Sequence, residues 1–484
     1  MSRPTTQPSL SARLRKLALP IAVIAITAGA TNAFGASPKL IAIPTLPGDT
    51  SNLGRAIVPD GLWVAGDSTG SSTRGFLYDV TGATVYNVLA IGQSTIAAGV
   101  CYRTSGGQQQ VIVGGMAAGW NADYCFANGV FVSGSCRRDI YNTGGHPKPT
   151  TGIANTRASG GGDVVGGGWA ENQDGPSYWA AISKVSGVWQ GQSTTVANDY
   201  DTAVPSSTTV YGVSGTGRAV GITQSLTIYV WDWTGSGTLT AWQFNGMDGT
   251  TSGEPFAISA DGTMIFGRSY SSDPASRPYL WPFKATFDTT MPGPATQLSI
   301  NELPSFPDTA PSAGGSAGLP YGCTADGKYA VGYSYRGMEK AVVWDTSASD
   351  PAKWTVLDLT ELAKLKGILG IFDGNLTRAY SAGTNAAGLV ITGFGYDNTA
   401  GATRAFLMTV PQPPAPELTI SNSGGGFTLN YLGLGNTTNV LEYTTGLNLP
   451  HTWTPLDTNS SGYITTYVDS APPDQKRFYR VRTQ

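Results

Sequence analysis

Charged side chains are scarce in this chain. Aspartate, glutamate, lysine and arginine make up 13% of the 484 residues, about half the usual share in a soluble domain. The 29 lysines and arginines are scattered singly, so no basic stripe exists that would neutralise the phosphates of a nucleic acid. We therefore expect no nucleic-acid partner.

Histidine and cysteine, the usual residues of metal and nucleophilic sites, are also few. His146 and His451 are the two histidines, and the four cysteines include no C-x-x-C pair, so we expect no metal and no cofactor. Neither histidine adjoins a nucleophile-elbow motif, and the Ser-x-Asp-x-Gly-x-x-Trp box common in sialidases is missing. The sequence thus predicts a protein that is not an enzyme.

The first 33 residues have the three parts of a secretory signal peptide. Four basic residues, Arg3, Arg13, Arg15 and Lys16, precede an apolar run over residues 17–30, and residues 31–33 offer a small-x-small cleavage site ending at Ala33. The apolar run is shorter than the roughly 20 residues that a helix needs to span a bilayer. We expect a protein that is secreted, or is held at the cell surface or in the periplasm, with no membrane span.

The composition favours an all-β fold. Glycine accounts for 64 residues, and 40% of the chain is hydrophobic, which is enough to build a core. Short runs of β-branched and aromatic residues alternate with turn signals, while long amphipathic helical patterns are missing.

One pattern recurs seven times between residues 34 and 410. Each copy has Gly or Ala, an apolar residue, Ser or Asn, a turn rich in Asp-Gly, an apolar run, a marker glycine, a variable polar loop and an aromatic-rich strand. The copies span residues 56–78, 99–126, 152–179, 212–231, 257–281, 322–344 and 382–406, with marker glycines Gly66, Gly114, Gly166, Gly221, Gly267, Gly332 and Gly393. The markers are 46 to 65 residues apart, which suits one four-stranded blade per copy.

The strand after each turn is apolar on both faces, so its sheet must be covered on both sides. Without helices to do this, neighbouring sheets must stack radially, which predicts a seven-bladed β-propeller.

We interpret Asp60-Gly61, Asp261-Gly262 and Asp326-Gly327 as two-residue hairpin turns rather than as an acidic site.

Four repeats share a segment in the expected outer strand: Arg74-Gly75-Phe76-Leu77, Arg277-Pro278-Tyr279-Leu280-Trp281, Lys340-Ala341-Val342-Val343-Trp344 and Arg404-Ala405-Phe406-Leu407. The pattern resembles the HAF repeats of exported bacterial proteins, named for a His-Ala-Phe triplet, although the histidine is replaced here. Residues 43–48 are similar to the Leu-Gly-Thr-Leu-Gly-Gly run before the first such repeat. The resemblance covers residues 39–410 and implies a propeller-like fold with no catalytic residue to carry over.

Two further elements are expected within the repeats. Residues 39–47 are predicted to pair with the strand near residues 404–410 and so to close the ring. Asp358 and Glu361 have capping-box spacing, which predicts a short helix that ends near Gly367 and packs between blades. Proteins of the HAF-repeat family often carry a similar leucine-rich helix at this place.

A proline-rich linker at residues 411–416 precedes a second β region at residues 417–484. Six strands are predicted, at residues 418–420, 427–431, 440–443, 453–456, 464–468 and 478–481, enough for a small β-sandwich-like domain. The region is similar to small C-terminal β modules of exported bacterial proteins, a resemblance that implies surface attachment or sorting. The alternative is a plain accessory domain whose Trp453 fills a core.

The cysteines allow one disulfide within a single repeat. Cys125 and Cys136 are close enough in sequence to bridge a loop of the second repeat. Cys101 and Cys323 occupy similar places in the second and sixth repeats, which a ring separates unless both face its channel.

Four aromatic residues are candidates for binding a ligand. Trp169, Tyr270, Tyr335 and Tyr396 each stand three residues after a marker glycine, and equivalent positions of a ring lie on one rim. They are candidates for stacking on sugars or gripping a partner's apolar side chains, and the alternative is packing between blades. The sequence therefore predicts an exported, non-enzymatic module that binds glycans or proteins or serves as envelope structure. The alternative is a secreted glycosidase or lyase with a carboxylate pair at the channel mouth.

Overall fold

The computed structural model describes residues 37–484 except 89–94, 106–107, 118–119, 128–129, 132–149, 154–163, 172–177, 186–197, 202–207, 224–225, 234–238, 248, 271–279, 289–290, 292–293, 307–316, 336, 423–425, 448–451 and 471–476. The predicted signal peptide, Cys136, His146 and His451 lie outside the described residues. Cys125 and Trp169 lie in strands whose side chains are not described.

The described residues before the proline-rich linker form seven four-stranded antiparallel sheets, one for each repeat. The first two contain β2 (Ser51–Ile57), β3 (Trp63–Thr69), β4 (Thr73–Asp79) and β5 (Thr84–Asn87), then β6 (Thr95–Ser105), β7 (Gln108–Ala117), β8 (Trp120–Ala127) and β9 (Val130–Phe131). The third and fourth contain β10 (Thr150–Ile153), β11 (Val164–Glu171), β12 (Tyr178–Val185) and β13 (Asn198–Asp201), then β14 (Thr208–Val213), β15 (Arg218–Thr223), β16 (Ile228–Trp233) and β17 (Leu239–Gln243).

The fifth and sixth sheets contain β18 (Gly253–Ile258), β19 (Met264–Tyr270), β20 (Leu280–Phe287) and β21 (Gln297–Glu302), then β22 (Gly318–Cys323), β23 (Tyr329–Tyr335), β24 (Glu339–Asp345) and β25 (Thr355–Asp358). The seventh contains β26 (Asn375–Asn385), β27 (Gly388–Asp397), β28 (Ala402–Val410) and β1 (Lys39–Ala42). The HAF-like segments lie in or run into β4, β20, β24 and β28, which are third strands rather than outermost ones.

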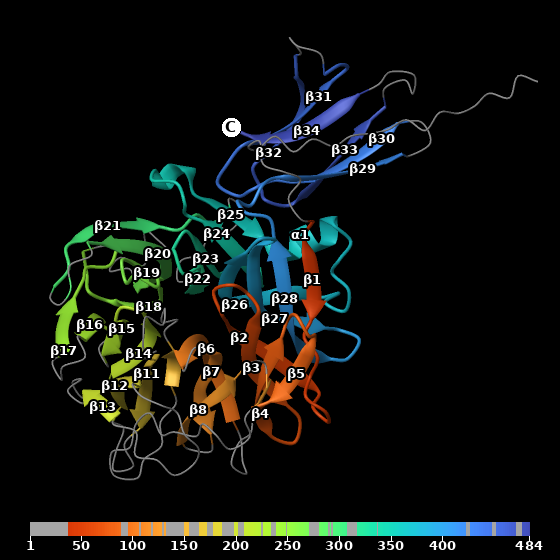
Figure 1. Ribbon diagram of the computed structural model, residues 1–484. Coiled ribbons are helices and arrows are strands. Elements are labelled where there is room, and N and C mark those ends of the chain that lie inside the picture. Colours follow the sequence, from red (N-terminus) through yellow and green to blue (C-terminus); the bar gives the residue numbers. More distant parts are fainter. Residues whose placement is uncertain are drawn as a thin grey trace, which may run out of the picture.

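The first strand of each sheet contacts the first strand of the next, and β26 returns to contact β2. The sheets therefore stand radially around a common axis (Figure 1), with the first strands innermost. Stacking covers both faces of each sheet, which explains why strands such as β23 are buried along nearly their whole length. This arrangement is a β-propeller, and the all-β prediction is confirmed.

The two ends of the ring are joined within one sheet, as predicted. β1 pairs antiparallel with β28, with Lys39 opposite Thr409 and Ala42 opposite Phe406. The side chain of Asn52 holds the two strands together, because its Nδ2 donates to Ile43 O at 2.9 Å and its Oδ1 accepts from Ala405 N at 2.8 Å. The outer edge of β28 is thus covered by the start of the chain.

The Asp-Gly pairs are turn residues, but the turns are longer than the predicted two-residue hairpins. In the fifth sheet Ser259 N bonds to Met264 O at 2.9 Å, and Gly262 N bonds to Ser259 O at 3.0 Å. Residues 259–262 thus form a four-residue turn whose last residue, Gly262, has a φ of 77°. Asp261 accepts hydrogen bonds from Ser259 Oγ and Thr263 N, so its carboxylate is used inside the turn.

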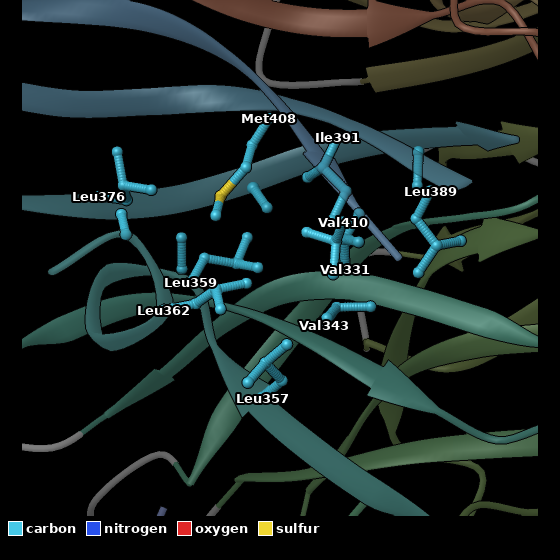
Figure 2. Close-up of a cluster of buried hydrophobic side chains, with 14 of the residues drawn as sticks. Val331, Val343, Leu357, Leu359, Leu362, Leu376, Leu389, Ile391, Met408 and Val410 are labelled. Atoms are coloured by element: carbon cyan, nitrogen blue, oxygen red, sulfur yellow. The ribbon is translucent and has the colours of Figure 1, made fainter. Parts of the chain in front are cut away.

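The predicted helix is present as α1 (Leu359–Leu365), after a 3₁₀ turn at Pro351–Lys353 and β25. Asp358 caps it by accepting from Thr360 N at 2.8 Å and Glu361 N at 3.1 Å. Leu359 and Leu362 point into a core between the sixth and seventh sheets (Figure 2), so the helix is a packing insert as expected.

Residues 417–484 form two three-stranded sheets from the six predicted strands. One contains β29 (Glu417–Asn422), β30 (Phe427–Leu432) and β33 (Ile464–Asp469), and the other β31 (Asn439–Thr444), β32 (Thr454–Asn459) and β34 (Phe478–Thr483). Both sheets contribute to one buried cluster that includes Tyr431 and Tyr479. Trp453 lies outside that cluster, with the Arg480 guanidinium 4.1 Å from its ring centroid.

This C-terminal module packs directly against the ring, in addition to being joined to it by the proline-rich linker. Leu432 and Leu434 belong to the same buried cluster as Leu359 and Leu362 of α1. The module's Glu417 also forms an ion pair of 2.6 Å with Lys366 at the end of that helix. Figure 1 shows the module beside α1 and β25. Among the described residues, no helix is both long and apolar enough to cross a membrane.

Candidate functional site: the central channel

Every innermost strand carries a β-bulge at an equivalent place. The register of each strand with its neighbour skips one residue, which is left without a partner in the ladder. Around the ring these bulged residues are Arg55, Ala98, Thr151, Tyr211, Phe256, Tyr321 and Tyr380. A bulge re-aims the side chain it carries, so the bulged residues whose side chains are described, Arg55, Tyr211, Phe256, Tyr321 and Tyr380, shape the chemistry of the axis.

The bulges explain the marker glycines. Gly332 pairs with the residue before the bulge of β22, and a Cβ added to it would lie 1.9 Å from Leu319 O. Gly66, Gly267 and Gly393 meet a carbonyl oxygen at 2.0 to 2.2 Å in the same way. Only glycine allows the bulged backbone to approach so closely.

The innermost strands surround a cavity of about 190 Å³. Its wall includes Arg55, Tyr211, Tyr321 and Tyr380, with small residues between them. Gly322 is one of these, and a Cβ there would lie 2.3 Å from Tyr380 O of the next innermost strand. Gly212 is similar, with Phe256 O at 3.2 Å from an added Cβ, so these two glycines let neighbouring innermost strands come close around the axis.

Four consecutive bulges place aromatic rings in one arc, which we call the aromatic arc: Tyr211, Phe256, Tyr321 and Tyr380. The ring centroids are 4.7 Å apart for Tyr211 and Phe256, 5.7 Å for Phe256 and Tyr321, and 4.9 Å for Tyr321 and Tyr380. The interplanar angles of 42°, 75° and 55° are those of tilted and edge-to-face contacts, which aromatic quadrupoles favour.

Arginine–carboxylate pairs border the arc. Arg378 donates from Nη2 to Glu339 Oε1 at 2.7 Å and from Nη1 to the Tyr321 hydroxyl at 3.2 Å. Arg268 donates from Nε to Glu254, which also accepts from the Tyr270 hydroxyl at 3.1 Å.

At the next bulge around the ring, Arg55 pairs with the buried Asp67. Burial raises the pKa of Asp67, although the charge of Arg55 opposes this. In the described part of the chain, Arg55, Arg268 and Arg378 thus each have their own carboxylate near the channel.

Two phenols and one thiol of the wall are held in their neutral form. Burial raises the pKa of Tyr211, with a further rise from the charge of Glu254, and burial also raises the pKa of Tyr321 against the opposing charge of Arg378. Burial raises the pKa of the Cys323 thiol to about 12, so this wall residue is not a thiolate at neutral pH. The phenols of Tyr211 and Tyr321 therefore act as hydrogen-bonding groups and not as bases.

The rim aromatics predicted from the sequence lie at or near the C-terminal ends of the second strands of their sheets. Tyr335 is 50% exposed and Tyr396 41% exposed, so the alternative of packing between blades does not describe these two. Tyr270 is partly buried against Glu254.

Trp169 does not occupy an equivalent place in its sheet. The residue before the bulge of β10 pairs with Gly168 rather than with the marker Gly166. Trp169 therefore stands one residue after its register glycine, whereas Tyr335 stands three after Gly332.

One further aromatic residue precedes each of Tyr335 and Tyr396 on the same strand face. Tyr333, between Tyr335 and the marker glycine, lies 6.0 Å from Tyr321, and Phe394 stacks 5.9 Å from Tyr380. The sixth and seventh sheets thus carry aromatic residues both beside the arc and at the end of the second strand.

Sequence reasoning missed the aromatic arc by one or two positions. In the fourth to sixth copies the repeat begins at Gly212, Ala257 and Gly322, and the bulged aromatic is the residue directly before each of these. In the seventh copy Tyr380 stands two residues before Ala382. An aromatic just ahead of the repeat in these four consecutive copies was the available signal.

The two cysteines that the structure describes are not joined to each other. Cys323 lines the channel, and Cys101 is buried. The predicted bridge between Cys125 and Cys136 falls on residues whose side chains are not described. Within the described part of the chain, no three His, Cys, Asp or Glu side chains gather as metal ligands would.

No protein-family model matches the chain, and no curated protein matches it. The resemblance to HAF repeats therefore stays a prediction. Among solved structures, the β-propeller domain of Cps50 (Swd1) from Myceliophteria thermophila is 9% identical, over 76% of this chain and 98% of that one, with a TM-score of 0.41. A chain of the Mitotic Checkpoint Complex is 11% identical, over 79% and 98%, with a TM-score of 0.40. The WD40 β-propeller domain of Doa1 is 12% identical, over 76% and 96%, with a TM-score of 0.37.

Proposed function

We propose that the protein is an exported, non-enzymatic binding module that takes a glycan or protein ligand at the mouth of its channel. In this proposal the seven sheets are the blades of one propeller of the HAF-repeat type. Residues 417–484 are a β-sandwich-like accessory domain, and the leader is removed near Ala33. The observation that carries the proposal is the aromatic arc, because four contacting rings at the axis are a preformed surface for ligand contact.

The rim tyrosines extend this surface. Tyr335 and Tyr396 are exposed, and Tyr333 and Phe394, two residues earlier on the same strands, contact the arc. A ligand seated in the channel therefore has further aromatic contacts available on the sixth and seventh blades.

The enzyme alternative finds less support at the channel. A glycosidase needs one carboxyl group that is protonated and free to donate its proton. Glu254 and Glu339 are the nearest candidates to the arc, and each accepts a hydrogen bond from an arginine. Each of these carboxyl groups is thus already held by a guanidinium, so neither is free to act on a substrate as a general acid.

The test is binding of the purified full-length mature chain to arrayed extracellular glycans and to displayed surface-protein fragments. The variants are Tyr380→Ala in the arc, Tyr335→Ala on the rim, and Tyr463→Ala in the C-terminal module as the matched control. We expect the arc variant to lose at least tenfold in affinity for the wild type's ligand, and Tyr463→Ala to lose none. Equal binding by all the proteins would place the ligand elsewhere and overturn the proposal.

A further inference from the structure

Among the described residues, the guanidiniums near the aromatic arc are paired with carboxylates. The three pairs are Arg55–Asp67, Arg268–Glu254 and Arg378–Glu339. Such pairing leaves little field to attract either an anion or a cation, whereas sites for charged ligands present uncompensated charge. The balance favours an uncharged ligand.

The arginines also occupy the positions that a cationic ligand would need. The Arg378 guanidinium carbon lies 5.9 Å from the Tyr321 ring centroid and 5.3 Å from that of Tyr333. Arg268 lies 5.9 Å from the Phe256 ring centroid. Each contact uses the cation–π attraction of its ring, so the arc does not function as an open cage for an ammonium group.

The volume of the cavity fits a small part of a ligand. Its volume of about 190 Å³ equals roughly six water molecules at ~30 Å³ each, and typical drug-sized pockets are larger. The wall combines aromatic rings with hydrogen-bonding groups, namely the Tyr211, Tyr321 and Tyr380 hydroxyls and the Ser381 side chain. A sugar ring matches both features, because its C–H face contacts aromatic rings while its hydroxyls need partners in fixed places.

We infer that the channel mouth binds an uncharged saccharide, one of whose sugar rings enters the cavity against Tyr321 and Tyr380. The inference rests on the proposed function and names its ligand class. The apolar face of the sugar contacts the aromatic arc, and its hydroxyls bond to the phenols and to Arg55. The rest of the glycan chain passes over the rim near Tyr335 and Tyr396, which are exposed on the same two blades.

The experiment uses the full-length mature chain on an array of hexasaccharides of three charge classes. The neutral class holds gluco-, manno-, galacto- and xylo-oligomers, the anionic class galacturonate and mannuronate oligomers, and the cationic class glucosamine oligomers. We expect binding in the neutral class alone, with an affinity that changes less than threefold between 0.05 and 0.5 M salt, since screening acts only on charges. Tightest binding to a charged class, a steep salt dependence, or no binding to any class would overturn the inference.

Two variants of one residue test the location. Tyr380→Ala removes a ring and is expected to weaken binding of the best neutral hexasaccharide about tenfold, within the energy range of aromatic contacts. Tyr380→Phe keeps the ring and should stay within about threefold of wild type, which guards against a folding defect in the alanine variant. Unchanged affinity in Tyr380→Ala would place the sugar outside the arc.

The outcomes also separate this inference from the proposed function. If the arc variant loses a protein ligand or a charged glycan while no neutral sugar binds, the channel is a binding site for another class and only the inference fails. If the arc variant loses no ligand of any class, both fail.

Discussion

Arg218 and Asp232 form an ion pair that is almost completely shielded from water. Arg218 Nε and Nη2 donate to the two carboxylate oxygens at 2.7 and 3.0 Å, and the side chains are 1% and 0% exposed. Arg218 Nη1 also donates to Gly262 O at 3.0 Å, in the Asp-Gly turn of the next blade. The pair therefore connects the fourth and fifth sheets.

Removing one partner of this pair should be costly. Arg218→Met leaves the Asp232 carboxylate buried without its partner, so we expect a loss of about 3–5 kcal/mol in the free energy of unfolding. Lys328→Met is the control, because Lys328 and Asp326 are 55% and 43% exposed and such pairs contribute less than about 1 kcal/mol. Urea unfolding of the full chain measures both, and equal losses would contradict the role of burial.

The marker glycines should not tolerate even alanine. Gly332→Ala places a Cβ 1.9 Å from Leu319 O, which forces the backbone of the bulge to move. We expect a loss of at least ~2 kcal/mol. Gly446→Ala is the matched control, since a Cβ there has no atom within 4 Å, and it should stay within about 0.5 kcal/mol of wild type. Thermal unfolding followed by circular dichroism distinguishes the two.

The C-terminal module should stabilise the ring. Leu434 is 4% exposed in the core it shares with α1, so Leu434→Ala should cost about 2–5 kcal/mol. Glu417→Gln breaks only the ion pair with Lys366, whose side chain is 22% exposed, and should cost less than about 1 kcal/mol. Calorimetry of these variants, and of a chain ending at Val410, measures the coupling. A truncated ring that melts at the wild-type temperature would show the module to be independent.

Lys284 should make stability rise with pH in the alkaline range. Lys284 is 5% exposed, and its ammonium donates to neutral oxygens, Gly327 O at 3.2 Å and Thr346 O and Oγ1 at 3.1 and 2.9 Å. Burial lowers the pKa of Lys284 in the folded protein below its unfolded value of about 10.4, although Cys323, Asp326 and Asp345 oppose this. Between those two pKa values the unfolded chain binds more protons, so stability increases as the pH rises.

The measurement is the difference in unfolding free energy between wild type and Lys284→Met across that range. Subtraction removes the contributions of the other titrating groups, such as Tyr329, whose pKa burial raises to about 12. We expect the unfolding free energy of the wild type to increase relative to that of the variant up to about pH 10.4. Above that pH the difference between the two should level off. A difference that shrinks with rising pH would show that the ammonium is favoured in the folded state.

The sequence by itself determined the repeat and the strands. A turn between apolar runs recurs seven times in the sequence, with Asp-Gly in three of the copies, because each sheet needs the same connection. The capping pattern at Asp358 specifies α1 through contacts only two and three residues away. The pairing of residues 39–42 with β28 also followed from the pattern, since a ring with an uncovered edge strand is disfavoured.

The tertiary structure alone decided the site. Bulge positions depend on the register between strands, and a shift of one residue changes which side chain faces the axis. For this reason the sequence did not reveal Tyr321 and Tyr380 as bulged residues. For the same reason Trp169 was aligned with Tyr335, although the register of its strand differs. Leu434 packs against α1, whose last residue, Leu365, is 69 residues earlier in the chain. The ion pair of Arg378 with Glu339 likewise joins residues of two different sheets. Local patterns encode local hydrogen bonds, whereas contacts between distant segments form only when the ring closes.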